Sequence, residues 1–496
     1  MKILLSGVTL TVLLFCSCRA RLTVNYDDAP PPERAFLESL LASPGFLSPL
    51  GLRLAPEAGE GTGIQLSFFT TWEPGMDPGA VSISRTCLVP RADALEGRRD
   101  TTRESCLSGA EDLIPLAGLE PPHIALRVEG RTAGDPDYPL VRVIQVRIAA
   151  AGDGKPRGGI QKKIDALEKA LREAPKPLME DPPDILWIAS AGDLMLDRGA
   201  QDILFNEGPA GIFGGTAEFL RNADLALVNL EGPVSGRGTR EQKSYNFRFD
   251  PETAAALRDA GIDAVLQANN HAFDYGETAF LDSLNHLETA GIGVLGAGLD
   301  EDTAAGPFKV QRGARKAAVF GIASFPRERN GWDGLTAAAG EDRAGILHAG
   351  RGGGEKLKSR FSGDDTLDIV LFHGGVEWSR RPDGPTRAFY TDLIEHGADL
   401  IIGSHPHIVQ GFEWVRGRAI FWSLGNYVFG GMENTDGGEE GLFLRLGFLG
   451  TRLVYLEPYP LTLSHTRTGI APAEQLDRFY ALSRELRDHG RGNTDK

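Results

Sequence analysis

The chain has 496 residues, enough for about two or three domains, and 41% of them are hydrophobic, so it can bury a sizeable core. Its formal net charge of −16 argues against sequence-independent binding to nucleic acid, which needs a positive surface. The 62 glycines predict many tight turns and strand-to-helix loops.

The first 18 residues have the pattern of an export signal. Lys2 supplies a positive charge, and Ile3 to Phe15 is an apolar run too short to span a bilayer as a helix. Cys18 follows Ser17 as at a bacterial lipoprotein processing site, so we expect residues 1–18 to be a lipoprotein-type signal peptide with lipid on Cys18. A plain secretory signal cut nearby is the alternative. Both predict an exported protein of the cell envelope, periplasmic or on the surface, and any membrane anchoring would be through the lipid.

Residues 19–150 predict a separate α+β N-terminal domain of unknown role. Cys87 and Cys106 are the only cysteines after the signal, and in an oxidising compartment we expect a disulfide between them. Two reduced thiols are the alternative. The predicted elements are a helix at 34–41 and strands at 64–70, 80–88 and 140–148.

Residues 151–184 predict a linker that contains a helix. Glycines open it, and residues 161–174 have helix-forming composition with Ile164, Leu167 and Leu171 on one face. Four prolines between 175 and 183 then break the chain, so we place the domain boundary here.

From residue 185 the pattern changes to alternating strands and helices, which predicts an α/β domain over 185–465. A C-terminal helix and polar tail follow at 466–496. The predicted strands are 185–191, 225–230, 262–268, 367–372, 399–402, 419–423, 442–449 and 452–456, and the predicted helices are 251–260, 277–290, 386–396 and 474–487.

Five of these strands end in residues that can bind a metal. They are Asp193, Glu231, Asn270, His373, and His405 with His407. Each alone has an ordinary explanation as a helix cap, a turn residue or a buried histidine. Ligands of open α/β sheets bind beyond the carboxyl ends of the strands, so together the residues indicate one site. Mixed nitrogen and oxygen ligands without thiolate suit Mn, Fe or Zn, and two such ions about 3.5–4 Å apart can clamp a phosphate.

Six ordered motifs in this domain resemble those of the CapA family, the poly-γ-glutamate capsule synthesis proteins. That family is similar to calcineurin-like metallophosphoesterases, and the resemblance covers about residues 185–465. The motifs are Gly192–Leu196, Asn229–Pro233, Asn269–Gly276, His373–Trp378, Gly403–His407 and Ser423–Phe429.

The resemblance implies a four-layer α/β/β/α metallophosphatase-like sandwich with one or two divalent transition metals. Two departures from the superfamily stand out: Met195 replaces a first-metal histidine, and Glu231 replaces the bridging aspartate. The implied ligands are Asp193 and His407 for the first metal, Asn270, His373 and His405 for the second, and Glu231 between them.

The resemblance also implies roles beside the metals. His271 would donate a proton to the substrate, and Asp274 would orient His271 by a hydrogen bond. A loop with Lys243, Tyr245 and Arg248 would bind an anionic substrate, although a solvated charged loop is the alternative. The residues expected to line the pocket are Glu377 and Trp378.

The sequence therefore predicts an exported, lipid-anchored metallophosphatase-like protein of capsule or cell-envelope polymer biosynthesis, export or attachment. Metal-assisted hydrolysis or transfer would act on an anionic polymer or phosphoester, alongside membrane-bound capsule synthesis proteins. The alternatives are a general periplasmic metallophosphoesterase, and a non-catalytic polymer- or partner-binding protein with a degenerate metal site.

Overall fold

The computed structural model describes residues 9–14, 20–25, 31–43, 53–55, 63–73, 76, 80–108, 110–135, 138–151, 160–174, 183–327 and 332–491. The chain forms two compact units. Unit 1 comprises Met1–Arg91, Asp100–Gly118 and Leu126–Pro183, and unit 2 comprises Ala92–Arg99, Leu119–Ala125 and Asp184–Lys496.

Unit 1 is built on a sheet whose strand order is β3-β1-β2-β4-β10-β5-β7. Helix α4 (Ile160–Glu173) packs on β10, and its buried face is Ile164, Leu167 and Leu171, as predicted. The predicted linker helix is therefore part of unit 1. The bounds are β1 Thr9–Leu14, β2 Ala20–Asn25, β3 Arg53–Ala55, β4 Gly63–Trp72, β5 Val81–Asp93, β7 Leu113–Pro115, β10 Val141–Ala151, α1 Pro31–Ala42 and α3 Arg103–Leu107. These confirm the helix and three strands expected in this region.

The expected export signal overlaps strand β1. Thr9–Leu14 pair antiparallel with β2, with Val12 opposite Leu22. A strand retained in the fold and a leader removed on export exclude each other in one mature protein, and Cys18 lies outside the described residues. Signal cleavage and lipidation thus stay predictions. Within the described ranges, no helix has the length and apolar character needed to cross a membrane.

The two predicted disulfide partners are both buried in unit 1. Cys87 and Cys106 are not joined to each other in the structure, and the Cys87 thiol faces the carbonyl oxygen of Ala133 at 3.7 Å. A disulfide in the oxidised, exported protein stays a prediction.

Unit 2 contains two large sheets. In the first, parallel strands β14, β13, β12 and β11 are continued by antiparallel β24, β25 and β26, and β23 also pairs with β11. The bounds are β11 Leu186–Leu194, β12 Leu225–Leu230, β13 Ala264–Leu266, β14 Gly293–Leu295, β23 Asn426–Val428, β24 Glu440–Leu449, β25 Arg452–Ser464 and β26 Arg467–Ile470.

The second sheet has the order β16-β17-β19-β20-β22-β21, with β17, β19, β20 and β22 parallel. Its strands are β16 Phe308–Arg312, β17 Arg315–Ser324, β19 Leu367–Gly374, β20 Leu400–Ser404, β21 Phe412–Val415 and β22 Arg418–Phe421. The eight strands predicted in this domain are present across the two sheets.

Residues of each central strand alternate between two hydrophobic cores, because successive side chains of a strand point to opposite faces. In β12, Leu225 and Leu227 join a core that also contains Ile369 and Ile402 of the second sheet. Ala226 and Val228 join a second core, shared with helices. The two sheets therefore face each other across the first core.

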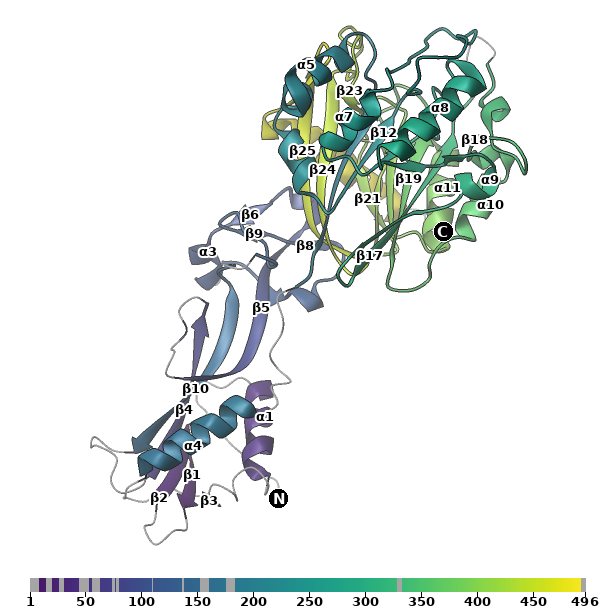
Figure 1. The fold of residues 1–496 in the computed structure, drawn as a ribbon. Coiled ribbons are helices and arrows are strands. Elements are labelled where there is room, and N and C mark those ends of the chain that lie inside the picture. The colour runs from purple at the N-terminus through teal and green to yellow at the C-terminus, as the bar shows by residue number, and fades with distance from the viewer. Residues whose placement is uncertain are drawn as a thin grey trace. The chain divides into compact units, whose positions relative to one another are not determined.

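Helices cover the other faces of both sheets (Figure 1). Leu204, Leu220 and Leu287 contribute to the core on the first sheet, and Leu357 and Tyr390 to the core on the second. The helices are α5 Ala200–Phe213, α6 Thr216–Asn222, α7 Thr253–Asp259, α8 Gly276–Thr289, α9 Glu301–Ala304, α10 Gly353–Lys358, α11 Gly384–Glu395 and α12 Leu476–Arg491. The parallel strands of each sheet run in the same direction, so their carboxyl ends lie at the same edge of that sheet.

Candidate metal centre

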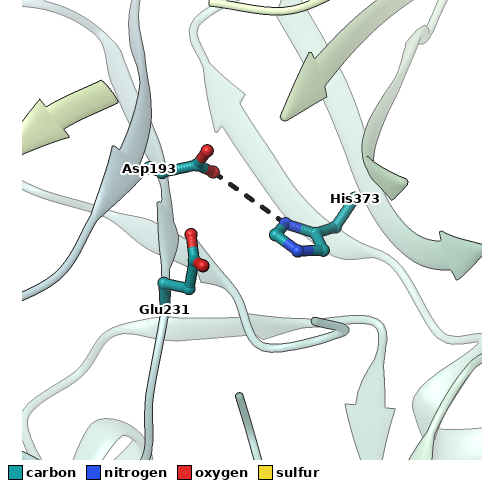
Figure 2. Close-up of side chains that lie close together, drawn as sticks. All are labelled: Asp193, Glu231 and His373. Atoms are coloured by element: carbon teal, nitrogen blue, oxygen red, sulfur yellow. Dashed lines mark ion pairs between the residues drawn. The ribbon is translucent and has the colours of Figure 1, made fainter. Parts of the chain in front are cut away.

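The six predicted ligand residues gather where these strands end, and all are buried. Asp193 lies near the end of β11 and His373 near the end of β19, while Glu231 and His405 directly follow β12 and β20. Asp193, Glu231 and His373 bring potential ligand atoms within 4.8 Å of one another (Figure 2). The exposed fractions are 0% for Asp193, Glu231 and His373, 2% for His405, and 5% for Asn270 and His407.

Asp193 and His407 form one half of the site. Asp193 Oδ2 lies 3.1 Å from His407 Nδ1, which is also 2.9 Å from Asn426 Oδ1. The backbone amide of His405 donates to Asp193 Oδ2 at 3.2 Å. This grouping matches the two residues that the resemblance implies for the first metal.

Asn270, His373 and His405 form the other half. His373 Nε2 is 2.9 Å from Asn270 Oδ1 and 3.1 Å from His405 Nδ1. These are the three residues implied for the second metal. Phe325 packs beside both imidazoles, with ring-centroid separations of 6.3 Å to His373 and 6.2 Å to His405.

Glu231 lies between the site's histidines and leaves one oxygen without a hydrogen bond. Its Oε1 is 3.7 Å from His407 Nε2 and 3.6 Å from His271 Nε2, and it has no hydrogen-bond partner among the described residues. His405 Nε2 is likewise buried and has no hydrogen-bond partner among the residues that the structure describes. Buried polar atoms without partners cost free energy, and both atom types are metal ligands, so the residues present fit a divalent transition metal.

Two asparagines that sequence reasoning did not single out support these ligands. Asn229 Nδ2 donates to Asp193 Oδ1 at 2.8 Å and to Glu231 Oε2 at 3.3 Å. Asn426 donates from Nδ2 to Gly438 O at 2.8 Å, which turns its Oδ1 toward His407. Both lie inside motifs that carry the family resemblance, and this position in the sequence could have indicated a role at the site.

Burial and mutual charge shift the pKa values of the site strongly. Burial, with the neighbouring charge of Asp193, raises the pKa of Glu231 well above its usual range. Burial and the charge of His407 lower the pKa of His405 to about 3. Burial alone would lower the pKa of His407, but the Glu231 charge and the Asp193 hydrogen bond raise it to about 10. A proton on His407 therefore offsets two crowded carboxylates, and a divalent cation would offset them in the same way.

The turn that carries the two histidines is conformationally strained. His405 and His407 have φ of 95° and 56°, values that residues other than glycine rarely adopt. Strain of this kind persists where the surrounding structure holds it, often at functional sites.

His271 lies beside the ligand cluster with the orientation expected of a proton donor. Its Nδ1 is 2.6 Å from Asp274 Oδ2, and its Nε2 faces Glu231 Oε1. Asp274 also accepts from the backbone amide of Phe247 at 2.8 Å. The predicted link between His271 and Asp274 is thus present in the geometry.

Lys243 has a different placement from the one expected of a substrate ligand. Its ammonium is buried, lies 2.7 Å from Asp274 Oδ1, and donates to the carbonyl of Asn270. The ring of Trp332 lies 4.1 Å from the same nitrogen. The charge of Lys243 is therefore placed to support Asp274 rather than to meet an incoming anion.

The other residues predicted to bind substrate lie on exposed or half-buried loops. Tyr245 is 65% exposed and Trp378 is 40% exposed, with the Trp378 ring 5.3 Å from that of His407. Glu377 is exposed, and its charge raises the pKa of Glu231 and of His407. Arg248 is half-buried and stacks its guanidinium 4.2 Å from the ring centroid of Tyr275.

Comparison with known proteins identifies relatives of unit 2. The family model described as bacterial capsule synthesis protein PGA_cap matches residues 187–431. The "PGA biosynthesis protein CapA" of Bacillus subtilis is 27% identical over 248 residues, 50% of this chain and 64% of the relative. The "Capsule biosynthesis protein CapA" of Bacillus anthracis is 27% identical over 266 residues, 52% of this chain and 63% of the relative. The match therefore spans less than two thirds of these relatives.

Other similarities are more distant. A "probable polyglutamine synthesis accessory protein" of Mycobacterium tuberculosis is 26% identical over 336 residues, 58% of this chain and 87% of the relative. A hypothetical protein from Thermus thermophilus aligns at 14% identity over 55% of this chain and 98% of its own, with a TM-score of 0.34. A phosphatase from Mycoplasma pneumoniae aligns at 16% identity over 57% and 95%, with a TM-score of 0.36.

Proposed function

The chain belongs to the CapA family of bacterial capsule synthesis proteins through residues 187–431, and on this premise we propose that it acts as a metal-dependent hydrolase or transferase on a cell-envelope polymer. The polymer would be of the poly-γ-glutamate type, and the step would belong to its synthesis, export or attachment. The observation that carries this proposal is the buried cluster of six ligand residues beside His271.

The proposed architecture of the catalytic domain is a four-layer α/β/β/α sandwich of the metallophosphatase kind. Its support is the division of buried side chains into one core between the two sheets and one helix-covered core on each outer face. This arrangement brings the carboxyl ends of β11, β12, β19 and β20 to one edge.

We assign one or two of Mn, Fe or Zn to the site as its resident metals. Asp193 and His407 would hold one ion, Asn270, His373 and His405 the other, with the free Oε1 of Glu231 available to both. When bound, such ions polarise a phosphoryl or carbonyl group and lower the pKa of water. Asn229 and Asn426 orient the ligands by hydrogen bonds, which is the usual role of residues behind a metal ligand.

The chain's own acid is His271. Asp274 holds its Nδ1, so Nε2 is the atom that would give its proton to the leaving group, the oxygen of a phosphoester or the nitrogen of a γ-glutamyl amide. Lys243 lies 2.7 Å from Asp274 Oδ1 and helps to hold that carboxylate in position. Water would add to the phosphorus or the carbonyl carbon, the P–O or C–N bond would break, and the proton from His271 would let the leaving group depart as a neutral alcohol or amine.

A non-catalytic role is the second candidate, and a specific residue favours it. Met195 stands where the resemblance places a metal-binding histidine, so the first ion would have one ligand fewer. A site with fewer ligands would bind an acidic polymer or a partner protein without turnover. The third candidate function is that of a general periplasmic metallophosphoesterase, which the same site geometry would also suit.

A substrate panel separates these three functions. Purified wild type and Asp193→Ala would be assayed with a phosphomonoester, a phosphodiester and poly-γ-glutamate, each with added Mn, Fe or Zn. Metal-dependent cleavage of poly-γ-glutamate, lost in Asp193→Ala, supports the proposal. Cleavage of simple phosphoesters alone supports the general phosphoesterase, and polymer binding without cleavage supports the binding protein.

A further inference from the structure

Arg198 lies in the loop between β11 and α5, five residues after Asp193, and its backbone is strained. Its φ is 57°, and its amide donates to Asp197 Oδ1 at 2.6 Å. The other oxygen, Asp197 Oδ2, accepts from the backbone amide of Arg248 at 3.3 Å. Asp197 therefore holds two backbone positions in place, and the strain it maintains at Arg198 calls for a functional reason.

The guanidinium of Arg198 is also held in a defined position. One nitrogen, Nη1, donates to the carbonyl of Gly430, and the central carbon lies 5.2 Å from the ring centroid of Phe247. A Cβ atom placed on Gly431 would lie 2.3 Å from Nη1. The missing side chain at Gly431 thus provides the space that the guanidinium occupies.

This position is one aromatic ring away from the chemistry. The Phe247 ring lies 4.4 Å from the ring of His271, and 5.6 Å from that of Phe429. Phe429 in turn lies 4.9 Å from His407. Arg198 is exposed, and it is separated from the proton donor His271 by one ring and from the proposed ligand His407 by two.

The charge of Arg198 is not matched by a carboxylate. Arg237 is paired with Asp282 and Arg380 with Asp436, whereas no ion pair joins Arg198 to a carboxylate among the described residues. Its fork has five N–H donors, and one is engaged by Gly430. The chain has a net charge of −16, so most of its charges repel an anion. The exposed guanidinium of Arg198, which has no paired carboxylate, would attract one.

We propose that Arg198 anchors an oxyanion of the substrate next to the group that His271 protonates. A planar guanidinium fork fits either a carboxylate of a glutamate polymer or the phosphate of a phosphoester. This inference rests on the proposed function, because it names the substrate group that the same site recognises. It gives to Arg198 the anion-binding role that the resemblance implies for Lys243 and Arg248.

The test measures binding of two probes, inorganic phosphate and a γ-linked glutamate oligomer, by calorimetry. Arg198→Gly removes the guanidinium and relieves the positive φ, so the variant retains its fold. We expect it to bind at least one probe about 10- to 100-fold more weakly, the range for losing a charged hydrogen-bond partner. Arg198→Lys keeps the charge without the fork and should fall between variant and wild type. The probe whose affinity falls in the variant shows whether Arg198 binds a phosphate or a carboxylate.

The matched control is Arg360→Ala. Arg360 is exposed and paired with Asp302 at 2.5 Å, before the amino end of β19 and away from the site edge, so its loss should leave both affinities unchanged. Wild-type affinity of Arg198→Gly for both probes, or no binding of either probe by the wild type, overturns the inference. Metal content is measured on the same samples. Arg198-dependent binding in a protein that takes up no metal would sustain the inference while the proposed function fails.

Discussion

At the scale of single residues, Asp274 joins three groups that are apart in the sequence. It accepts from His271 Nδ1, the Lys243 ammonium and the Phe247 amide, and its side chain is fully buried. An ionised carboxylate in this position fixes the orientation of His271 and stabilises its protonated ring. His271 itself belongs to neither proposed group of metal ligands.

This assignment predicts that His271→Ala retains metal while losing activity. General acid catalysis contributes about 10²–10⁴-fold to rate, so turnover of a substrate with a poor leaving group should fall by that factor. The loss should be smaller for a good leaving group, which needs no proton. Measurement of both rates and of metal content checks this. An emptied metal site would make His271 a ligand, and an unchanged rate with the poor leaving group would place the acid elsewhere.

Sequence reasoning was able to find the ligand residues but not their supports. Asp193, Glu231 and His405 are recognisable because each follows an apolar strand, and strand ends meet at one edge. Arg198 and Asn229 act through contacts with residues far along the chain or across strands, which spacing does not reveal. The resemblance implied an anion-binding role for Lys243, and its contact with Asp274, 31 residues away, is not visible in the sequence.

At the scale of elements, the end of β20 lies too close to Trp422 and Tyr390 for a side chain at Gly403. A Cβ atom on Gly403 would lie 2.0 Å from Trp422 O and 2.6 Å from Tyr390 Oη. Gly403→Ala should therefore shift the end of β20, which leads directly into His405. Overpacking of a core typically costs about 1–3 kcal/mol of unfolding free energy, and we expect a loss of metal as well.

Urea unfolding and elemental analysis check this prediction, with Gly384→Ala as the control. Gly384 has open space around its Cβ position, so alanine there should be neutral or slightly stabilising. Wild-type stability and full metal content in Gly403→Ala would show that the strand end adapts, contrary to the expectation.

At the opposite edge of the second sheet, Asp399 should make the free energy of unfolding depend on pH. Asp399 precedes β20, accepts from the amide of Asp368 at 2.9 Å, and lies 2.8 Å from Arg418. Burial outweighs these contacts and raises its pKa to about 6, above the value of about 3.9 in an unfolded chain. The folded state then holds a proton that the unfolded state has lost, so this residue's contribution to stability falls as pH rises from about 4 through 6.

Asp399→Asn removes that titration. The wild type should therefore lose unfolding free energy relative to Asp399→Asn as pH increases across this range, measured by urea unfolding of both proteins at each pH. A constant difference, or a wild type that gains on the variant with rising pH, would mean that the ion pair with Arg418 keeps Asp399 ionised.

The elements that sequence reasoning found and missed differ in composition. Strands rich in Leu, Ile and Val, such as β12 and β19, were predicted within two residues of their ends. Strand β17 was missed because its centre is rich in alanine and glycine, which have low strand propensity. Helix α5 was missed because Gly208 and Pro209 interrupt it, and Gly208 has non-helical backbone angles.

At the scale of the whole molecule, the N-terminus carries two incompatible expectations. The apolar run before Cys18 predicts an exported lipoprotein, whereas Thr9–Leu14 form strand β1. A signal peptide is removed in the mature protein, so a mature form that begins at a lipidated Cys18 would lack β1. We predict that metabolic labelling with a fatty acid tags the wild type in its host, and that Cys18→Ser abolishes the tag. A tag that persists in the variant, or never forms, would contradict lipidation at Cys18.

The proposed function of unit 2 requires that its buried ligand cluster binds divalent transition metals. Its most direct test is elemental analysis of the purified full chain, with Asp193→Ala and His405→Ala beside it and Arg360→Ala as the control. We predict one or two equivalents of Mn, Fe or Zn in the wild type and the control, and a sharp loss in the two ligand variants. A wild type that is purified without metal and takes up none of these ions on titration would contradict the account.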